Sequence, residues 1–390
     1  MTLRRTVTSL LLRTLRLFGP GRRPPMPDFA PQRIAVMRFG GFGDVLAVTS
    51  LARALREDYP NARIDFYTDP ASTVVLEHNP DIDNVVVSPK PRLGANPLTV
   101  WRNIRRVRRW SATPYDLAFV VHHEFDILLL SLFFRARFRI GFDINERGFD
   151  FAFTHSACTY TSDHPGIAGH MSRHFTAHQQ QLLHAFQGRA RAIANPRIEI
   201  SADETARAQA FVRERGLEGD LVIVAPGGSV PIKLWPMENF AAVARHMIER
   251  YDVAVLVMVG PAEAEHAKYF ENMPGRFAFD AGGNSFRDNM AIVRLARAMV
   301  GNDTGLMHVG AQFGVPAVAL FGPTPPTIFG YAHLGHRILT ADLPCIPCNA
   351  PHCRLLADGG ARDTAPCMQA IEPARVIREM DALLQRPAAA

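Results

Sequence analysis

The chain has 390 residues, enough for two domains at roughly 100–200 residues each, with a hydrophobic core in both. Hydrophobic residues make up 47% of it and charged residues 21%, which excludes collagen-like, disordered and disulfide-stapled classes. The net charge of +6 reflects six arginines in the first 23 residues, where no acidic residue occurs. The rest is nearly charge-balanced, so we expect no nucleic-acid partner.

Residues 1–30 form a basic arm ahead of the first predicted strand. Read as a helix, the arm places leucines on one face and arginines on the other, which is typical of a segment lying on an anionic membrane. A disordered extension is the alternative. The longest apolar run, 127–134, is far shorter than the ~20 residues that cross a bilayer, and no secretory signal is evident. We expect a cytoplasmic protein, with a peripheral contact to the inner membrane as one interpretation.

Short β-branched runs alternate with helical patterns along the rest of the chain. Ten of them predict buried strands, at 33–38, 63–67, 84–87, 117–121 and 138–141, then at 221–225, 253–259, 277–280, 298–301 and 317–321. The intervals suit crossover helices, for example 236–251 and 286–296, so both sheets are predicted to be parallel. We expect an α/β chain of two Rossmann-like, doubly wound units, 31–195 and 196–372, then a helix and tail at 373–390. Ligands would bind in a cleft between the units.

The first strand runs into a glycine turn, Phe39-Gly40-Gly41-Phe42-Gly43-Asp44. Exposed backbone N–H groups there predict a binding site for an anion or an oxygen-rich substrate, with Gly41 and Gly43 on the acceptor side. A dinucleotide fingerprint is disfavoured because Leu46 stands where its third glycine belongs. Asp44 is either the N-cap of the following helix or a general base for a substrate hydroxyl.

In the second unit, three strand ends carry groups suited to a nucleotide. Pro226-Gly227-Gly228-Ser229 is followed by Lys233, which can neutralise a phosphate, although a solvated lysine is the plainer interpretation. Glu263 follows the next strand and can accept from ribose hydroxyls. A third turn leads into a helix whose first N–H groups can bind a diphosphate, Gly301-Asn302-Asp303-Thr304-Gly305-Leu306-Met307-His308.

An arginine-dense helical segment lies in the first unit between Trp101 and Trp110. A solvated face is one interpretation. The other is an anion surface for the acceptor, because arginine binds phosphates and carboxylates bidentately; it would use Arg102, Arg105 and Arg106.

The ordered set of motifs resembles glycosyltransferase family 9, the lipopolysaccharide heptosyltransferase family. The resemblance rests on residues 38–46, on the Lys-x-Trp-Pro at 233–236 and above all on Asp303-Thr304-Gly305-x-x-His308 joined to Phe321-Gly322-Pro323-Thr324. It implies a GT-B fold that binds the acceptor on the first unit and a nucleotide sugar on the second.

The resemblance also implies roles for individual residues. Asp44 would be the catalytic base and Lys233 would stabilise the departing diphosphate. The donor would be held by Ser229, Lys233, Glu263, Asp303, Thr304, Gly305 and His308. It implies transfer of a sugar, such as heptose from ADP-heptose, to a lipid-linked saccharide. Neither metal nor cofactor is expected; a transferase using another nucleotide sugar and an inactive nucleotide-sugar-binding scaffold remain alternatives.

Four cysteines gather near the end of the chain, at Cys345, Cys348, Cys353 and Cys367. The first pair has metal-ligand spacing but the second has not, so structural zinc, a disulfide and reduced thiols are all open. His170, His174 and His178 have the spacing of one helix face, which we interpret as acceptor-side or solvated residues rather than a metal stripe.

Overall fold

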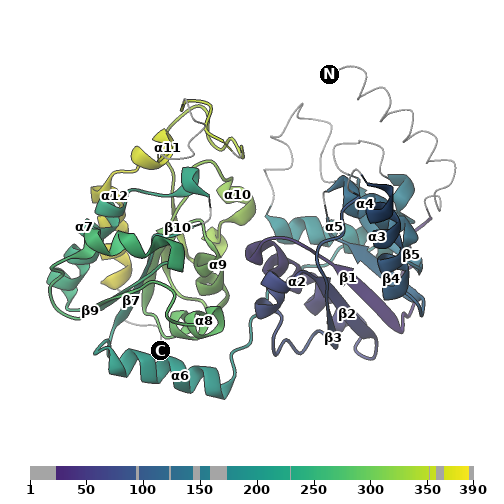
Figure 1. Cartoon of the computed structure of the whole chain (residues 1–390), viewed down its shortest axis with the longest axis horizontal. Coiled ribbons are helices and arrows are strands. Elements are labelled where there is room, and N and C mark those ends of the chain that lie inside the picture. The colour runs from purple at the N-terminus through teal and green to yellow at the C-terminus, as the bar shows by residue number, and fades with distance from the viewer. Residues whose placement is uncertain are drawn as a thin grey trace. The chain divides into compact units, whose positions relative to one another are not determined.

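A computed structural model describes residues 23–93, 96–122, 124–143, 150–158, 174–228, 230–350, 352–356 and 364–385. The chain divides into two units, Met1–Arg197 and Ile198–Ala390. Each contains a six-stranded parallel sheet with helices on both faces (Figure 1). Among the described residues, no helix is long and apolar enough to span a membrane.

The first sheet has the order β3-β2-β1-β4-β5-β6. Its strands are β1 (Arg33–Met37), β2 (Arg63–Thr68), β3 (Asn84–Val87), β4 (Tyr115–Val120), β5 (Ala136–Asp143) and β6 (His155–Cys158). Helices α2 (Phe42–Asp58) and α5 (Phe175–Gln187) pack together on one face, and α3 (Pro97–Trp110) and α4 (Phe125–Leu130) on the other (Figure 1). This order is typical of Rossmann folds, in which ligands bind at the carboxyl ends where the order reverses, here between β1 and β4.

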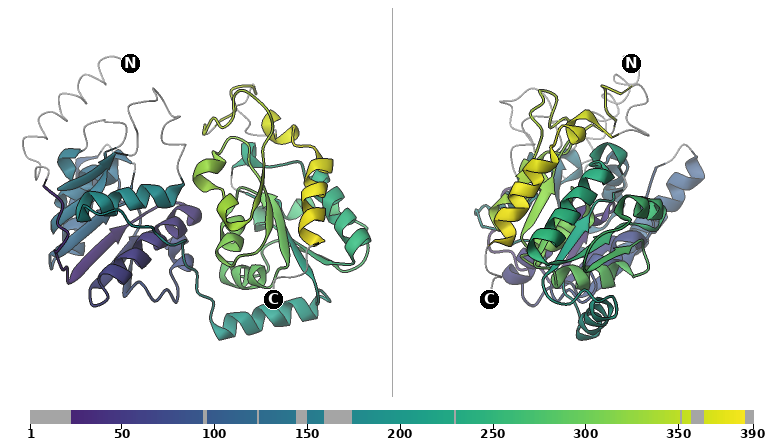
Figure 2. Two further views of the ribbon diagram at one scale, coloured as in Figure 1. Left: turned by 180° about the vertical axis from the view of Figure 1, so that it is seen from behind. Right: turned by 90° about the vertical axis from the view of Figure 1, so that its left-hand side faces the viewer.

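The second sheet repeats that arrangement in the order β12-β11-β10-β7-β8-β9. Its strands are β7 (Leu221–Ala225), β8 (Ala254–Met258), β9 (Phe277–Asp280), β10 (Ala298–Asn302), β11 (Ala317–Leu320) and β12 (Arg337–Leu339). Helices α7 (Met237–Tyr251) and α12 (Pro373–Leu384) cover one face (Figure 2). The other face carries α8 (Phe286–Arg294) and α9 (Gly305–Gln312), and α6 (Ala202–Glu214) packs on α8. The order reverses between β7 and β10.

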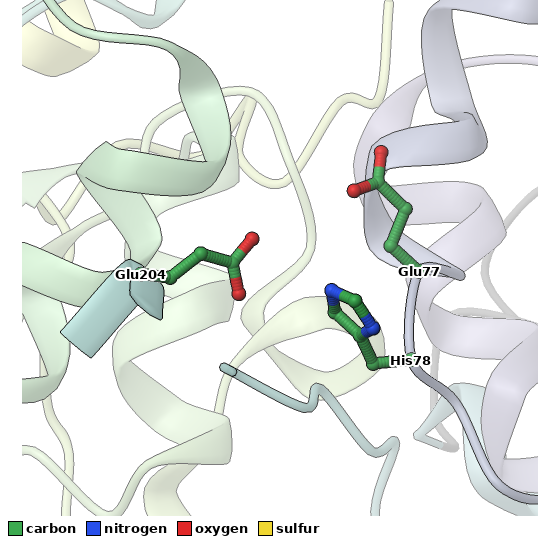
Figure 3. Close-up of side chains that lie close together, drawn as sticks. All are labelled: Glu77, His78 and Glu204. Carbon is green, nitrogen blue, oxygen red and sulfur yellow. The ribbon is translucent and has the colours of Figure 1, made fainter. Parts of the chain in front are cut away.

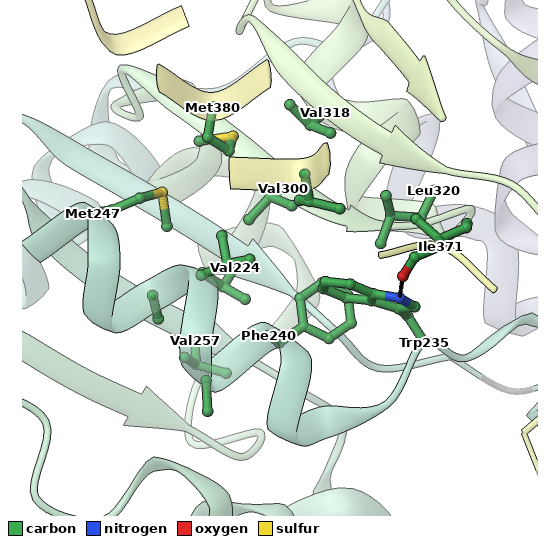
Figure 4. Packing of buried hydrophobic residues seen from close by; sticks show 14 of the residues in the cluster. Val224, Trp235, Phe240, Met247, Val257, Val300, Val318, Leu320, Ile371 and Met380 are labelled. Carbon is green, nitrogen blue, oxygen red and sulfur yellow. Dashed lines mark hydrogen bonds between the residues drawn. The ribbon is translucent and has the colours of Figure 1, made fainter. Parts of the chain in front are cut away.

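A continuous apolar core lies between this sheet and helices α7 and α12 (Figure 4). Val224, Val300 and Val318 contribute from the strands, and Met247 and Met380 from the helices. Strands covered on both faces read as unbroken apolar runs, which is why the sequence predicted the central strands so closely.

Two predictions about local structure need correction. The edge strands β6 and β12 were not predicted; they are only four and three residues long and carry polar residues such as His155 and Arg337. The expected histidine face is wrong, because α5 begins at Phe175 and His174 precedes it as the N-cap. His170 lies outside the described residues. All ten predicted strands are confirmed to within a few residues.

Candidate functional site

In the first unit, the candidate site is the turn between β1 and α2. Gly40 has φ +138°, a conformation that L side chains rarely adopt, so the turn depends on glycine there. Helix α2 begins at Phe42 with Gly41 as its N-cap, which makes no side-chain capping bond. Asp44 therefore does not cap the helix, and the capping alternative is wrong.

Asp44 lies in the first turn of α2 with its side chain 42% exposed. Its carboxylate Oδ1 is 2.7 Å from a guanidinium nitrogen of Arg38, the residue that follows β1. Arg38 also donates to the carbonyl of Val121, beyond the end of β4. The ion pair fixes the direction of the Asp44 carboxylate while its exposure leaves it open to a substrate.

Two further side chains hold the turn in place. Asp69, which follows β2, accepts from the backbone N–H of Gly40 at 2.7 Å. His122, which follows β4 and is 2% exposed, accepts from the N–H of Phe39 through Nε2 at 3.0 Å. No role was predicted for Arg38, Asp69 or His122. The one signal in the sequence is that each of them lies just past the end of a strand.

In the second unit, the carboxyl ends of β7, β8 and β10 border a cavity of about 550 Å³. Its lining includes Gly227, Gly228, Glu263, Thr304 and Gly305, together with residues that follow β9. Thr304 is the N-cap of α9, so the first N–H groups of that helix lie at the cavity wall. A cavity of this volume suits a small ligand, and its helix terminus suits an anion.

Glu263 joins two of the glycine loops around the cavity. Its Oε1 accepts from the N–H of Gly228 and its Oε2 from the N–H of Gly260, both at 2.9 Å. A Cβ atom on Gly227 would lie 2.4 Å from Oε2, so this loop can approach the carboxylate only as glycine. Each carboxylate oxygen keeps acceptor capacity for a ligand hydroxyl.

A charged cluster lies next to Thr304, since its central residue Asp303 directly precedes Thr304 in the sequence. The cluster consists of Lys233, Asp303 and His308. Lys233 Nζ lies 2.9 Å from Asp303 Oδ2, and His308 Nε2 lies 3.5 Å from Asp303 Oδ1. Asp303 is 5% exposed, whereas the lysine side chain is 30% exposed. Burial alone would raise the pKa of Asp303, but the hydrogen bond and charge of His308 and the charge of Lys233 outweigh it and lower that pKa.

The buried Trp235 anchors the loop that carries Lys233. The indole N–H donates to the carbonyl of Ile371, and the ring packs edge-on against Phe240 (Figure 4). The backbone N–H of Trp235 donates to Asn302, whose amide donates in turn to Pro226. Asn302 thereby ties the ends of β7 and β10 together, a role the sequence analysis did not assign.

The predicted donor residues fall into two groups in this unit. Glu263, Thr304 and Gly305 line the cavity, whereas Lys233, Asp303 and His308 form the cluster beside it. Ser229 lies outside the described residues. In the first unit Gly41 and Gly43 are in the β1–α2 turn, but Arg102, Arg105 and Arg106 are on α3 and make no hydrogen bond or ion pair with that turn.

Neither described unit contains a preformed metal site. Glu77, His78 and Glu204 are drawn together in Figure 3, but the first two belong to one unit and Glu204 to the other. Apart from them, no three described His, Cys, Asp or Glu ligand atoms lie within 4.8 Å of one another.

The cysteine cluster at Cys345, Cys348, Cys353 and Cys367 consists of free thiols. Burial, together with the charges of the other three thiols, raises the pKa of the Cys367 thiol to about 11.

The chain contains one Asp-x-Asp tripeptide, the motif through which many transferases bind a metal-bridged diphosphate. It is Asp81-Ile82-Asp83, at the amino end of β3, whereas the glycine turn lies at the carboxyl end of β1. Asp83 accepts from the backbone N–H of Ile64 and pairs with Arg56. These contacts give the tripeptide a structural role within the sheet.

Comparisons with known proteins agree with these features. A sequence model of glycosyltransferase family 9 (heptosyltransferase) matches residues 100–357. The chain is 26% identical over 302 residues to lipooligosaccharide heptosyltransferase 2 of Haemophilus ducreyi, covering 73% of this chain and 82% of the relative. It is 24% identical over 310 residues to lipopolysaccharide heptosyltransferase 2 of Escherichia coli K12, covering 75% and 84%.

Solved structures are similar over nearly the whole chain. A family 9 glycosyltransferase from Veillonella parvula matches with TM-score 0.72 and 24% identity, over 92% of this chain and 99% of that one. The E. coli ADP-heptose lipopolysaccharide heptosyltransferase II matches with TM-score 0.65 and 20% identity, over 90% and 98%. The predicted GT-B fold of two Rossmann-like units is confirmed. Because the family model covers more than half of the chain, this protein belongs to glycosyltransferase family 9 and is a glycosyltransferase.

Proposed function

We propose that the protein is an inverting, metal-independent transferase that moves heptose from ADP-heptose to the lipopolysaccharide core or a related lipid-linked saccharide. The observation that carries the proposal is the cavity of the second unit, with Glu263 on one wall and the amino end of α9 on another. The relatives named as heptosyltransferases, and the ADP-heptose in the name of one of them, support the choice of donor.

The cavity and the charged cluster of Lys233, Asp303 and His308 together supply groups suited to the ribose, the diphosphate and the sugar of the donor. Glu263 would accept from the ribose hydroxyls, since both of its oxygens are held toward the cavity by the glycine loops. The N–H groups of Thr304 and Gly305 would bind the β-phosphate at the positive end of the α9 dipole. Ser229 would contact the diphosphate, and Asp303 and His308 would contact the transferred sugar.

The proposed chemistry uses the negative charge of Asp44 and the positive charge of Lys233. Asp44 takes the proton of the acceptor hydroxyl, and the oxygen of that hydroxyl forms a bond to the anomeric carbon. The bond from that carbon to the β-phosphate oxygen breaks, and its electron pair leaves with the nucleoside diphosphate. Lys233 and the α9 terminus stabilise this developing charge, so no step requires a metal ion. Attack opposite the leaving group inverts the anomeric configuration.

Gly41 and Gly43 would admit the acceptor close to the backbone of the β1–α2 turn, where the Arg38 ion pair orients Asp44. The acceptor is lipid-linked, so we place the protein in the cytoplasm with a peripheral contact to the inner face of the inner membrane.

Donor identity is tested by melting the protein with ADP-, UDP- and GDP-sugars, because a ligand that binds only the folded state raises Tm. We expect ADP-heptose to raise Tm and to support transfer to a lipopolysaccharide acceptor in the presence of EDTA. A rise with a UDP- or GDP-sugar alone would contradict the donor assignment. A rise in Tm with ADP-heptose but no transfer to any acceptor would favour the inactive nucleotide-sugar-binding scaffold.

A further inference from the structure

Helix α3 in the first unit, labelled in Figure 1, exposes an unusual face. Val107 and Asn103 are buried on its inner side. On the opposite side, Leu98 is 66% exposed and Trp101 is 55% exposed. The exposed positions follow the i, i+3, i+4, i+7, i+10, i+11 spacing of a single helix face. We call these six residues the α3 face: Leu98, Trp101, Arg102, Arg105, Arg108 and Arg109.

The charge of the α3 face is not neutralised within the described part of the unit. Helix α3 contains no acidic residue, and no described carboxylate lies within 4.0 Å of Arg102, Arg105, Arg108 or Arg109. The guanidinium of Arg105 instead lies 4.4 Å from the centre of the Trp101 ring. Helix α4, which packs on α3, carries one charged residue, Asp126, and its carboxylate accepts from the backbone N–H of Leu93.

Arg106 differs from these arginines. It is half-buried and donates to the carbonyl of Pro89, which lies between β3 and α3. It therefore holds the preceding loop and does not belong to the α3 face. Arg102 and Arg105, in contrast, are exposed members of that face.

From these observations we propose that the α3 face docks on a bilayer containing anionic phospholipid. Guanidinium groups bind lipid phosphates bidentately, while tryptophan and leucine are the side chains that enter the boundary between headgroups and acyl chains. The two exposed apolar side chains set such a surface apart from a merely solvated arginine cluster. The inference rests on the proposed function only in that a lipid-linked acceptor lies in such a bilayer.

The test measures sedimentation of the full chain with vesicles, without donor or acceptor, so that its outcome is independent of catalysis. Phosphatidylglycerol–phosphatidylcholine vesicles are compared with phosphatidylcholine alone. Each surface arginine contributes roughly five-fold to binding of an anionic bilayer. We therefore expect the triple variant Arg102→Gln, Arg105→Gln, Arg109→Gln to bind phosphatidylglycerol vesicles about 100-fold more weakly than the parent protein.

A matched control removes the same charge elsewhere. Arg213, Arg215 and Arg378 are exposed residues of the second unit, and Arg215 also lies over an aromatic ring. Their triple replacement by glutamine is expected to leave vesicle binding unchanged. An equal loss in both triple variants would show that net charge alone drives binding, and unchanged binding of the α3 variant would assign the contact to another segment. Either result overturns the proposal.

Trp101 gives an independent readout. The chain has three tryptophans, of which Trp235 is buried and Trp110 half-buried. Insertion of Trp101 into the bilayer should shift tryptophan emission to the blue with anionic vesicles, and Trp101→Phe should abolish the shift while the protein still binds. Emission that does not change on binding would contradict docking through this face.

Discussion

The two units carry the same sheet order but place opposite charges at their strand ends. In the first, the carboxylate of Asp44 is 42% exposed and its partner Arg38 is 12% exposed. In the second, the carboxylate of Asp303 is 5% exposed and its partner Lys233 is 30% exposed. The more exposed member of the ion pair is therefore a carboxylate in the first unit and an ammonium group in the second. Under the proposed function, the two units would serve the two ends of one displacement reaction, because each exposes the opposite member of its ion pair.

The buried partner also differs in kind. Arg38 is held by a backbone carbonyl and by Asp44. Asp303 is shared between Lys233 and His308, and His308 in turn contacts the buried Tyr331 hydroxyl at 3.2 Å. We therefore expect replacements in the second unit to affect stability as well as function, and Asp44 replacements to affect function alone.

The largest expected effect is that of Asp44→Asn. Loss of a positioned general base should lower the transfer rate about 10²–10⁴-fold, with donor affinity and Tm unchanged. The measurement is kcat with ADP-heptose and a lipopolysaccharide acceptor. Glu57→Gln on the same helix is the control, because Glu57 is exposed and, among the described residues, forms ion pairs with the half-buried Arg53 and Arg191. Full activity of Asp44→Asn would remove the base from the mechanism.

Lys233→Met should slow transfer about 10²–10³-fold, because the charge on the departing diphosphate loses a fixed cation. It should also lower Tm, since Asp303 would lose one of two partners in a buried position. Lys233→Arg should restore Tm more fully than rate. A Lys233→Met protein with normal Tm and slow transfer would mean that the ion pair does not stabilise the unit.

Stability of the second unit should fall in acid. The hydrogen bond from Arg287 is the main cause that lowers the pKa of Glu204 to about 2, and Glu204 also completes the capping box of α6. A carboxylate whose pKa is depressed stabilises the fold above its unfolded value near 4.5, and this contribution is lost as pH falls toward 2. The full contribution is about 3 kcal/mol, of which about 2 kcal/mol should be lost by pH 3.

The check is unfolding of the parent and of Glu204→Gln between pH 7 and pH 3. The variant should be less stable at neutral pH and should lose less stability on acidification. Parallel pH profiles for the two proteins would show that Glu204 is not the titrating group.

The smallest expected effect concerns the cavity loop. Gly227→Ala would bring Cβ to 2.4 Å from Glu263 Oε2 and push the carboxylate out of its two backbone bonds. We expect about ten-fold weaker ADP binding by calorimetry, equivalent to roughly the net worth of one charge-assisted hydrogen bond. In a Glu263→Ala background the same glycine replacement should cost almost nothing further. If the two substitutions weakened ADP binding additively, Gly227 would not act through the position of the Glu263 carboxylate.

Much of the fold could be predicted because the central strands are buried on both faces. Such strands consist of continuous apolar runs that can be recognised in the sequence. The predicted strand at 221–225, for example, has the same bounds as β7. The edge strands β6 and β12 escaped detection because a short strand paired on one side needs few apolar residues. Asp44, Lys233, Glu263 and Thr304 were selected from the sequence as candidates because each follows a strand or glycine turn. His122 and Asp69 were not, since their roles depend on neighbouring strands far away in sequence.

The two parallel sheets, the family and the chemical types at the strand ends can be derived from the amino-acid sequence, because periodicity and local motifs encode these directly. The tertiary fold, in contrast, sets which partner each charged group takes. It paired Asp44 with Arg38, buried Asp303 between Lys233 and His308, and separated Arg106 from the exposed arginines of α3. The physical reason is that exposure and pairing depend on which strands and helices come together, and no local pattern records that.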